Sequence, residues 1–523
     1  MNDKSRFPNI PLYRKTDSNP AVRAFGRRFY RDQTPLEYLA EFLLCFSSDK
    51  EGIGSEKECG LPSLGDWQKE QLQELVYWPE SRLALKLFSF FPSSKLETRH
   101  PVHVDRFKQL IGDLEERVES DHVENKQRAV TVLQQLFSGF VGVAGQRTWA
   151  THSFIPASRF LLSREVDWRH SDALKNNVTT WHETDKYFTS GSHNFMARGG
   201  EVLFLQLWHV LRGMDTSEVE RWLNTNYDHI KWSWFEMEID VGLWNLLTAI
   251  DAPLAKLGGV IEEVAEETPP VKELNQRSQE FGWVPRASWK EAALFAWELN
   301  NIVSSRQDPL RKVRILQDLC CLQVLRSICF QAARLVNQED QPRAVDFVGG
   351  YAWIAVSPQA SRNTDLGKIS HASQGATEEL LFKAVRSASL PGISGATPAE
   401  EAAEKADEHG YKLFRGLGKQ IGLIVPRTGP MRFTLSSALV EATALALICP
   451  GERVSFDEYL WRLYRHFGIA VGPAQIEAAS ATLGEGVRLA PQTVSAEWLE
   501  DELKRGGFLI PLSDATPLVE TPE

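Results

Sequence analysis

Cysteine is scarce in this chain, and none of it is arranged as a metal-binding or redox motif. The six cysteines are spread over 523 residues, and no two of them form a C-x-x-C pair. Small secreted domains that depend on disulfides are far denser in cysteine. The scarcity therefore excludes a disulfide scaffold and favours the reducing environment of the cytoplasm.

Long apolar runs are absent as well. The first twenty residues, MNDKSRFPNIPLYRKTDSNP, contain no apolar core of the kind that a signal peptide needs. The most apolar stretches, such as 435–449, are shorter than the roughly 20 residues that cross a bilayer, and Ser, Glu and Thr interrupt them. We therefore expect a cytoplasmic protein with no membrane contact.

The short motifs of the large enzyme classes are missing too. The chain has no G-x-x-x-x-G-K-[ST], no G-x-G-x-x-G after a strand, no H-E-x-x-H, no G-x-S-x-G and no kinase signature set. These absences argue against P-loop NTPases, dinucleotide-binding enzymes, zinc proteases of that type, α/β-hydrolases and kinases. We expect no resident cofactor and no metal, and the balance favours a protein that is not an enzyme.

The composition is that of a globular protein with an acidic balance. Hydrophobic residues make up 43% of the chain, charged residues make up 24%, and the formal net charge is −11. Such a balance disfavours attraction of the whole surface to nucleic acid. The sixteen tryptophans favour a protein partner, because large aromatic side chains are enriched at interfaces.

Apolar residues recur mostly at helical spacing, which predicts a mainly α, multidomain protein with a small α+β portion. Asp308 and Pro309 are a typical helix start, and they predict a long helix over 309–338. The acidic stretch 262–273 is the best linker candidate. We expect an N-terminal helical domain at 1–149, a loop-rich His/Asp segment with helices at 150–261, a helical domain at 274–389 and a C-terminal region at 409–523.

The C-terminal region has a recognisable order of elements. Residues 411–432 read as short strands and turns, and several short helices and a terminal apolar strand follow them. This order predicts a winged-helix-like module. Residues 433–523 carry six basic and thirteen acidic side chains, a balance of −7. A winged helix that reads DNA usually has a basic face, so this module is expected to bind protein.

The segment from Asp167 to Glu201 concentrates the residue types that catalysis and metal binding use. A packed loop whose polar groups satisfy one another is the alternative interpretation. At its end Gly199 and Gly200 open a helix, whose free N–H groups suit an anion. The catalytic candidates in the segment are His182, Glu183, Asp185, His193 and Arg198.

Two groups of basic residues are candidates for phosphate contact. The stretch 411–432 contains five basic and no acidic residues, interleaved with glycine and aromatic side chains. The other group stands at the start of the long helix, where cations oppose the helix dipole. A solvated cationic face is the alternative for both groups, which consist of Lys412, Arg415, Lys419, Arg427 and Arg432, and of Arg311, Lys312 and Arg314.

Three stretches carry a resemblance to known proteins: RRFYRDQTPLEYLAEFLL (27–44), HNFMARGGEVLFLQL (193–207) and RFTLSSALVEATALALICPGERVSFDEYLWRLYRHFG (432–468). They resemble uncharacterised proteins encoded in bacterial anti-phage defence gene clusters. The resemblance contains no catalytic motif and transfers no functional residue. It implies a bacterial protein that works with other proteins of the same gene cluster.

Three hypotheses about function follow. The leading one is a non-catalytic scaffold or adaptor of a bacterial defence or DNA-processing complex, in contact with partner proteins and with DNA or RNA. The second is a hydrolase or nuclease with a new polar site within 167–201. The third is a sensor of an anionic small molecule that uses the helix start at Gly199 and Gly200.

Overall fold

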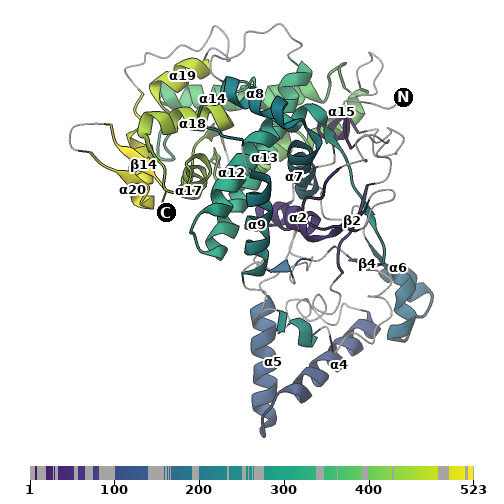
Figure 1. Cartoon of the computed structure of the whole chain (residues 1–523). Coiled ribbons are helices and arrows are strands. Elements are labelled where there is room, and N and C mark those ends of the chain that lie inside the picture. Colours follow the sequence, from purple (N-terminus) through teal and green to yellow (C-terminus); the bar gives the residue numbers. More distant parts are fainter. Residues whose placement is uncertain are drawn as a thin grey trace.

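The computed structural model is mainly helical, as the sequence predicts, with seventeen α-helices in its described part and a few small sheets (Figure 1). The part of the chain that it describes consists of residues 6–8, 19–26, 29, 33–51, 57–64, 75–81, 100–138, 158–159, 162, 164, 166–190, 199–232, 235–249, 255–256, 258–261, 263, 276–336, 347–361, 363–390, 398–426, 429–480, 494–512 and 516–521.

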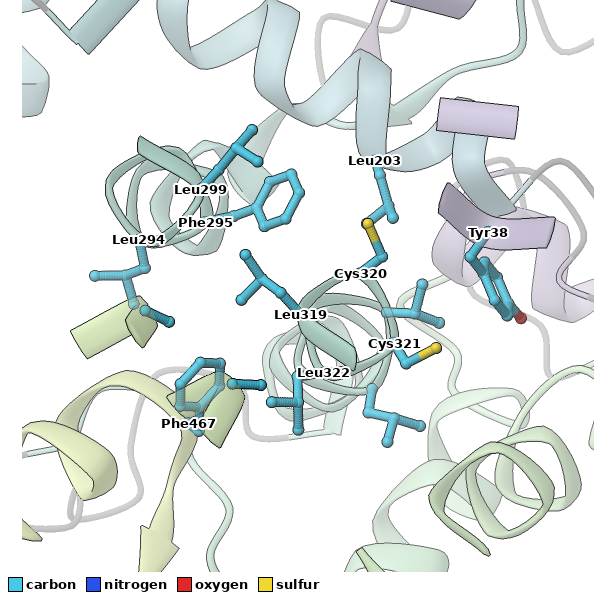
Figure 2. Packing of buried hydrophobic residues seen from close by; sticks show 14 of the residues in the cluster. Tyr38, Leu203, Leu294, Phe295, Leu299, Leu319, Cys320, Cys321, Leu322 and Phe467 are labelled. Carbon is cyan, nitrogen blue, oxygen red and sulfur yellow. The ribbon is translucent and has the colours of Figure 1, made fainter. Parts of the chain in front are cut away.

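Two long helices, α12 (Trp289–Ser304) and α13 (Pro309–Val336), form the centre of the molecule. The start of α13 is the expected one, since the Asp308 carboxylate accepts the Leu310 N–H at 2.9 Å. The structure describes this helix as far as Val336, and the last two residues of the predicted span, 337 and 338, lie outside the described residues. Figure 2 shows α13 with Leu319 and Leu322 pointing into side chains of the surrounding helices.

Helix α13 is the one described helix that is long and apolar enough to cross a membrane, and 89% of its most apolar window is buried inside the protein. Neighbouring parts of the protein therefore cover most of the apolar surface of α13.

Helices α2 (Pro35–Ser47) and α7 (Gly199–Trp208) pack on each other beside α13. The start of α2 is a capping box, in which Thr34 and Glu37 satisfy each other's backbone and side-chain groups. Every residue of α7 is buried. Such burial on all sides agrees with its sequence, which is apolar apart from Glu201 and Gln206.

The other helices surround this centre, and α4 and α5 form a hairpin that extends away from the main body (Figure 1). In chain order they are α1 (Pro20–Phe25), α4 (Pro101–Arg117), α5 (Val123–Ser138), α6 (His170–Lys175), the 3-10 helix η7 (Trp181–Tyr187), the π-helix η8 (His209–Gly213), α8 (Thr216–Asn226), α9 (Phe235–Thr248), the 3-10 helix η9 (Arg286–Ser288), α14 (Asp365–Ala384), α15 (Glu400–Asp407), α16 (Tyr411–Gln420), α17 (Ser437–Leu447), α18 (Phe456–Phe467), α19 (Pro473–Ser480) and α20 (Glu497–Gly506).

The strands are short and form small, separate sheets. Their orders are β1-β7, β10-β9, β11-β14-β13, β12-β8, β2-β3-β6 and β4-β5, and the β12–β8 pair is parallel. The strands are β1 (Arg6–Phe7), β2 (Asp49–Glu51), β3 (Val76–Trp78), β4 (Val166–Trp168), β5 (Phe188–Ser190), β6 (Gln279–Glu280), β7 (Val284–Pro285), β8 (Trp353–Ile354), β9 (Ile424–Val425), β10 (Arg432–Phe433), β11 (Arg453–Ser455), β12 (Ile469–Ala470), β13 (Leu509–Ile510) and β14 (Leu518–Glu520).

One hydrophobic core connects the four segments expected from the sequence. A single cluster of buried side chains includes Leu110, Leu203, Leu322 and Leu463, one from each segment. The division into four domains remains a prediction, but the segments share this buried surface. The predicted linker 262–273 lies outside the described residues, apart from Glu263.

The prediction of strands and turns throughout 411–432 was wrong for its first half, which is the helix α16. Leu413, Phe414, Leu417 and Gly418 are buried there at helical spacing. Glycine inside this stretch reflects close packing, because a Cβ on Gly418 would lie 2.7 Å from the Ile424 side chain. The second half contains the predicted short strands, β9 and β10.

Candidate functional site

Residues 166–190, the part of the polar segment before α7 that the structure describes, form a small unit in which β4 and β5 pair antiparallel around α6 and η7. The Glu183 carboxylate accepts the backbone N–H groups of Thr179 and Thr180 at 3.0 and 3.1 Å. These hydrogen bonds lower the pKa of Glu183. Glu183 therefore belongs to the capping box at the start of η7. This role agrees with the packed-loop interpretation of this position.

The other catalytic candidates are not brought together by what the structure describes. His182 is exposed on η7. His193, Arg198 and the side chain of Asp185 lie outside the described residues. Within the described part of the chain, no group of three or more His, Cys, Asp or Glu side chains could hold a metal ion. The prediction of a site in this segment stays untested.

Two histidines that the sequence argument did not single out, His100 and His103, lie against this segment. The His100 ring is 5.7 Å from that of His170, and burial, with His170 beside it, lowers the pKa of His100. His103 stacks on Phe188 at 5.7 Å. The i, i+3 spacing of His100 and His103 at the start of α4 is the signal that could have identified them.

The carboxylate of Glu41 lies at the N-terminal end of α7. The Gly200 N–H donates to Oε2 of Glu41, on α2, at 2.8 Å. The next residue, Glu201, accepts the Gly282 N–H at 2.6 Å and the Tyr77 hydroxyl at 3.3 Å. The sequence predicted an anion at Gly199 and Gly200. In the structure the Glu41 carboxylate of the chain itself occupies that position.

Close packing of α2 on α7 explains the two glycines. A Cβ on Gly200 would lie 2.5 Å from the Phe42 backbone nitrogen and would also meet the Tyr38 carbonyl oxygen. A Cβ on Gly199 would overlap the Tyr38 ring. Only glycine lets the two backbones approach this closely.

The basic stretch 411–432 is less cationic in the structure than its sequence indicates. Lys412 pairs with Glu408 at 2.7 Å. Arg415 pairs with Glu378 of α14, with its Nε 2.8 Å from Oε1. Arg432 donates to the Pro358 carbonyl oxygen at 3.0 Å. Two acidic residues outside the stretch, Glu408 four residues before Lys412 and Glu378 of α14, thus compensate two of the five cations.

The two remaining cations of this stretch are Lys419 and Arg427. Lys419 lies in the last turn of α16, where a positive charge complements the helix dipole. Arg427 lies outside the described residues. Contact of the stretch with nucleic acid stays a prediction.

The basic residues at the start of α13 also have roles within the fold. Arg311 pairs with Glu441 of α17. The Lys312 ammonium donates to the Val303 carbonyl oxygen at 2.8 Å, near the C-terminal end of α12. Arg314 is exposed. The set therefore does not form one cationic face, because Arg311 and Lys312 connect helices.

The C-terminal region combines α17, β11, α18, α20, β13 and β14, with β12 and α19 between α18 and α20 (Figure 1). Strand β14 lies between β11 and β13, with Val519 opposite both Val454 and Leu509. Leu499 and Leu503 of α20 are buried against this sheet and α17. The Ser437 hydroxyl donates to Glu502 at 2.8 Å and joins α17 to α20.

The outer side of α20 is acidic at its N-terminal end. Glu497 and Asp501 are exposed and Glu500 is half-buried. Burial raises the pKa of Glu500, and the neighbouring carboxylates Glu497, Asp501 and Asp457 raise it further. These carboxylates therefore lie close enough to repel one another. We name the three from α20, Glu497, Glu500 and Asp501, the acidic face of α20; the fourth, Asp457, belongs to α18.

A buried polar network that the sequence did not predict lies where α12, α13 and α18 meet. Arg326 and Glu298 form a two-pronged ion pair, with both N–O distances 2.7 Å and neither side chain exposed. Nδ1 of His466 is 2.8 Å from Glu298 Oε1, and Nε2 of His466 is 3.0 Å from Nε2 of His229. On its outer side His229 faces the exposed Asp228, with Nδ1 3.5 Å from Oδ1.

The hydrogen-bond geometry assigns the protons in this network. His466 donates its Nδ1–H to the Glu298 carboxylate, so its Nε2 must accept. His229 then donates its Nε2–H to His466, and its Nδ1, 3.5 Å from the exposed Asp228 carboxylate, carries no proton. Both imidazoles are neutral in this arrangement.

Burial shifts the pKa values of both histidines in the direction that this assignment requires. It lowers the pKa of His229 to about 3, with His466 and Arg462 as further causes. It lowers the pKa of His466 well below the usual value, and Arg326 adds to the effect. Burial also raises the pKa of Glu298 to about 7, while the Arg326 guanidinium opposes that rise.

A further buried histidine, His209, begins the π-helix η8 and stacks on Phe7 at 4.4 Å. Neither of its ring nitrogens has a hydrogen-bond partner within the described part of the chain. Burial lowers the pKa of His209 to about 3, so this imidazole is neutral too.

Comparison with known proteins adds no relative, since no protein family, no curated protein and no solved structure matches this chain.

Proposed function

We propose that this chain is a non-catalytic adaptor or scaffold of a bacterial defence or DNA-processing complex, and that its C-terminal region binds a partner protein. The observation that carries the proposal is the acidic face of α20. The resemblance of three stretches to proteins of anti-phage defence gene clusters supports the setting. The partners are then other proteins of the same gene cluster.

The order of elements supports a winged-helix-like arrangement for this region. In winged-helix modules a helix, a strand and two further helices precede a hairpin, and the last strand of the hairpin pairs with the first strand. The sheet order β11-β14-β13 and the helices α17, α18 and α20 correspond to this pattern. In this correspondence α20 occupies the place of the helix that enters the major groove in DNA-binding members.

The charge of α20 favours protein over DNA as its ligand. The acidic face would meet the phosphates of a duplex, and like charges in proximity disfavour association. A basic protein surface would instead relieve the repulsion that raises the pKa of Glu500. We therefore propose a partner whose docking surface is rich in Lys and Arg.

Charge reversal on α20 tests the proposal. The tagged full-length chain would be recovered from the bacterium that encodes it, at low salt, and the proteins that accompany it identified by mass spectrometry. The variant Glu497→Lys/Glu500→Lys/Asp501→Lys is expected to lose partners that the wild type retains. An equal reversal on the α4–α5 hairpin, at the exposed residues Glu116, Glu119 and Glu124, is the matched control and is expected to retain them.

Circular dichroism and thermal unfolding would show that both triple variants fold. Identical sets of accompanying proteins for the wild type and the α20 variant would contradict the proposal, because they would place any partner contact elsewhere on the chain.

A further inference from the structure

The His229–His466 pair joins parts of the chain that are far apart in sequence. His229 lies in the segment after α8, and His466 lies in the last turn of α18. Their nitrogens are 3.0 Å apart, and the Trp297 ring of α12 packs on both imidazoles at 5.3 and 5.2 Å. Nearby, the Tyr227 hydroxyl donates to the Arg465 carbonyl oxygen at 3.0 Å. The pair is thus the polar part of a contact between α18 and the central helices.

This contact cannot persist once both rings are protonated. If both imidazoles were protonated, each Nε2 would carry a hydrogen, and the two N–H groups would point at each other across 3.0 Å. The side chains of the pair are at most 6% exposed, so water cannot replace the lost hydrogen bond. Protonation of both rings therefore requires the contact to open.

The charges around the pair reinforce this requirement. Three cations face it, Arg326 from α13 and Arg462 and Arg465 from α18. The facing anions are Glu298 of α12, which the Arg326 guanidinium already neutralises, and Asp228, whose side chain is 86% exposed. Glu452 lies beside Arg462 and pairs with it. An imidazolium here would therefore lie among cations with no buried anion of its own.

We propose that the His229–His466 pair is a proton-operated latch, which holds α18 and the C-terminal region on the α12–α13 core when both rings are neutral and releases them when acid protonates both. The latch does not depend on what the C-terminal region binds. It would make the attachment of that region sensitive to acidification below about pH 6.5, the ordinary pKa of a free histidine.

Proton linkage sets the size of the effect. A histidine that is neutral in the closed state and free in the open state raises the opening equilibrium constant about tenfold between pH 7.5 and pH 5.5. Two such histidines raise it about 100-fold over the same interval when Glu298 stays ionised in its pair with Arg326. Hydrogen–deuterium exchange of the full-length chain measures this constant in peptides that cover α18 and residues 227–232, after correction for the intrinsic pH dependence of amide exchange.

Substitutions separate the latch from general acid sensitivity. His229→Gln keeps a donor toward His466 but removes one titrating ring, so the change over this pH interval is expected to fall to about tenfold. His466→Gln gives the same expectation if the first variant does not fold. His182→Gln, at an exposed histidine of η7, is the matched control and is expected to keep the 100-fold change.

A further variant tests whether His229 is protonated while the contact is still closed, with Asp228 as the counter-ion. Asp228→Asn removes the carboxylate that lies 3.5 Å from Nδ1 of His229, and the 100-fold change is expected to remain. The proposal would be overturned by exchange in α18 that does not respond to pH. It would also be overturned by a full 100-fold response in His229→Gln, or by loss of the response in Asp228→Asn.

Discussion

Replacement of Gly200 by alanine is expected to destabilise the protein, although alanine is the better helix former. The new Cβ would lie 2.5 Å from the Phe42 backbone nitrogen and 2.6 Å from Cβ of Glu41. Overpacking of this kind costs about 1–3 kcal/mol, and loss of the Gly200–Glu41 hydrogen bond adds about 1.5–3 kcal/mol. Helix propensity returns at most about 1 kcal/mol. We expect a net loss of about 3 kcal/mol in the free energy of unfolding.

Gly375→Ala on α14 is the matched control. Gly375 is exposed in the middle of a helix, and a Cβ added there would have no neighbour within 4 Å. This substitution is expected to stabilise the protein by up to about 1 kcal/mol. Urea unfolding followed by circular dichroism, with both variants and the wild type in parallel, measures the difference. Equal stability of the two variants would refute the argument that close packing of α2 on α7 requires glycine.

Three further predictions concern the buried charges and the basic stretch. Glu298→Ala leaves Arg326 buried without its partner, and urea unfolding should show a loss of about 3–5 kcal/mol; a loss below 1 kcal/mol would contradict the ion pair's role. The pKa of His209 is lowered to about 3, so its neutral form contributes stability that is lost as pH falls from 6.5 toward 3. His209→Phe should therefore reduce the loss of unfolding free energy between pH 7.5 and pH 5 by about 2 kcal/mol, and an unchanged pH dependence would count against a neutral buried ring. If the 411–432 stretch contacts DNA, binding of labelled DNA should fall steeply with salt and be lost in Lys419→Glu/Arg427→Glu, whereas binding that survives this double change would place the contact elsewhere.

The helices that the sequence predicted well have strong local signals. Asp308 and Pro309 begin α13, the long helix predicted over 309–338, because capping acts within a few residues. The stretch 411–420 failed for the opposite reason. Its glycines indicate a break when read locally, but Gly418 is needed for close contact with Ile424. Tertiary packing of this kind leaves no local signature.

The candidate sites show the same difference between local signals and tertiary contacts. Glu183 and Gly200 stood out as polar or flexible positions. Glu183 is satisfied locally by Thr179 and Thr180, whereas Glu41, the partner of Gly200, lies far away in the sequence. The network of Glu298, Arg326 and His466 was not predicted, because each residue lies singly on an apolar helix face. A charged residue on such a face indicates a buried partner, but periodicity alone does not identify that partner.

Binding of the recovered partner to the purified chain across a salt series tests the proposed adaptor function most directly. The account predicts an affinity that falls as salt rises, that is lost in Glu497→Lys/Glu500→Lys/Asp501→Lys, and that is unchanged when Glu116, Glu119 and Glu124 are reversed instead. An affinity that is independent of salt and equal in all three proteins would contradict it, because the acidic face of α20 would then have no part in the complex.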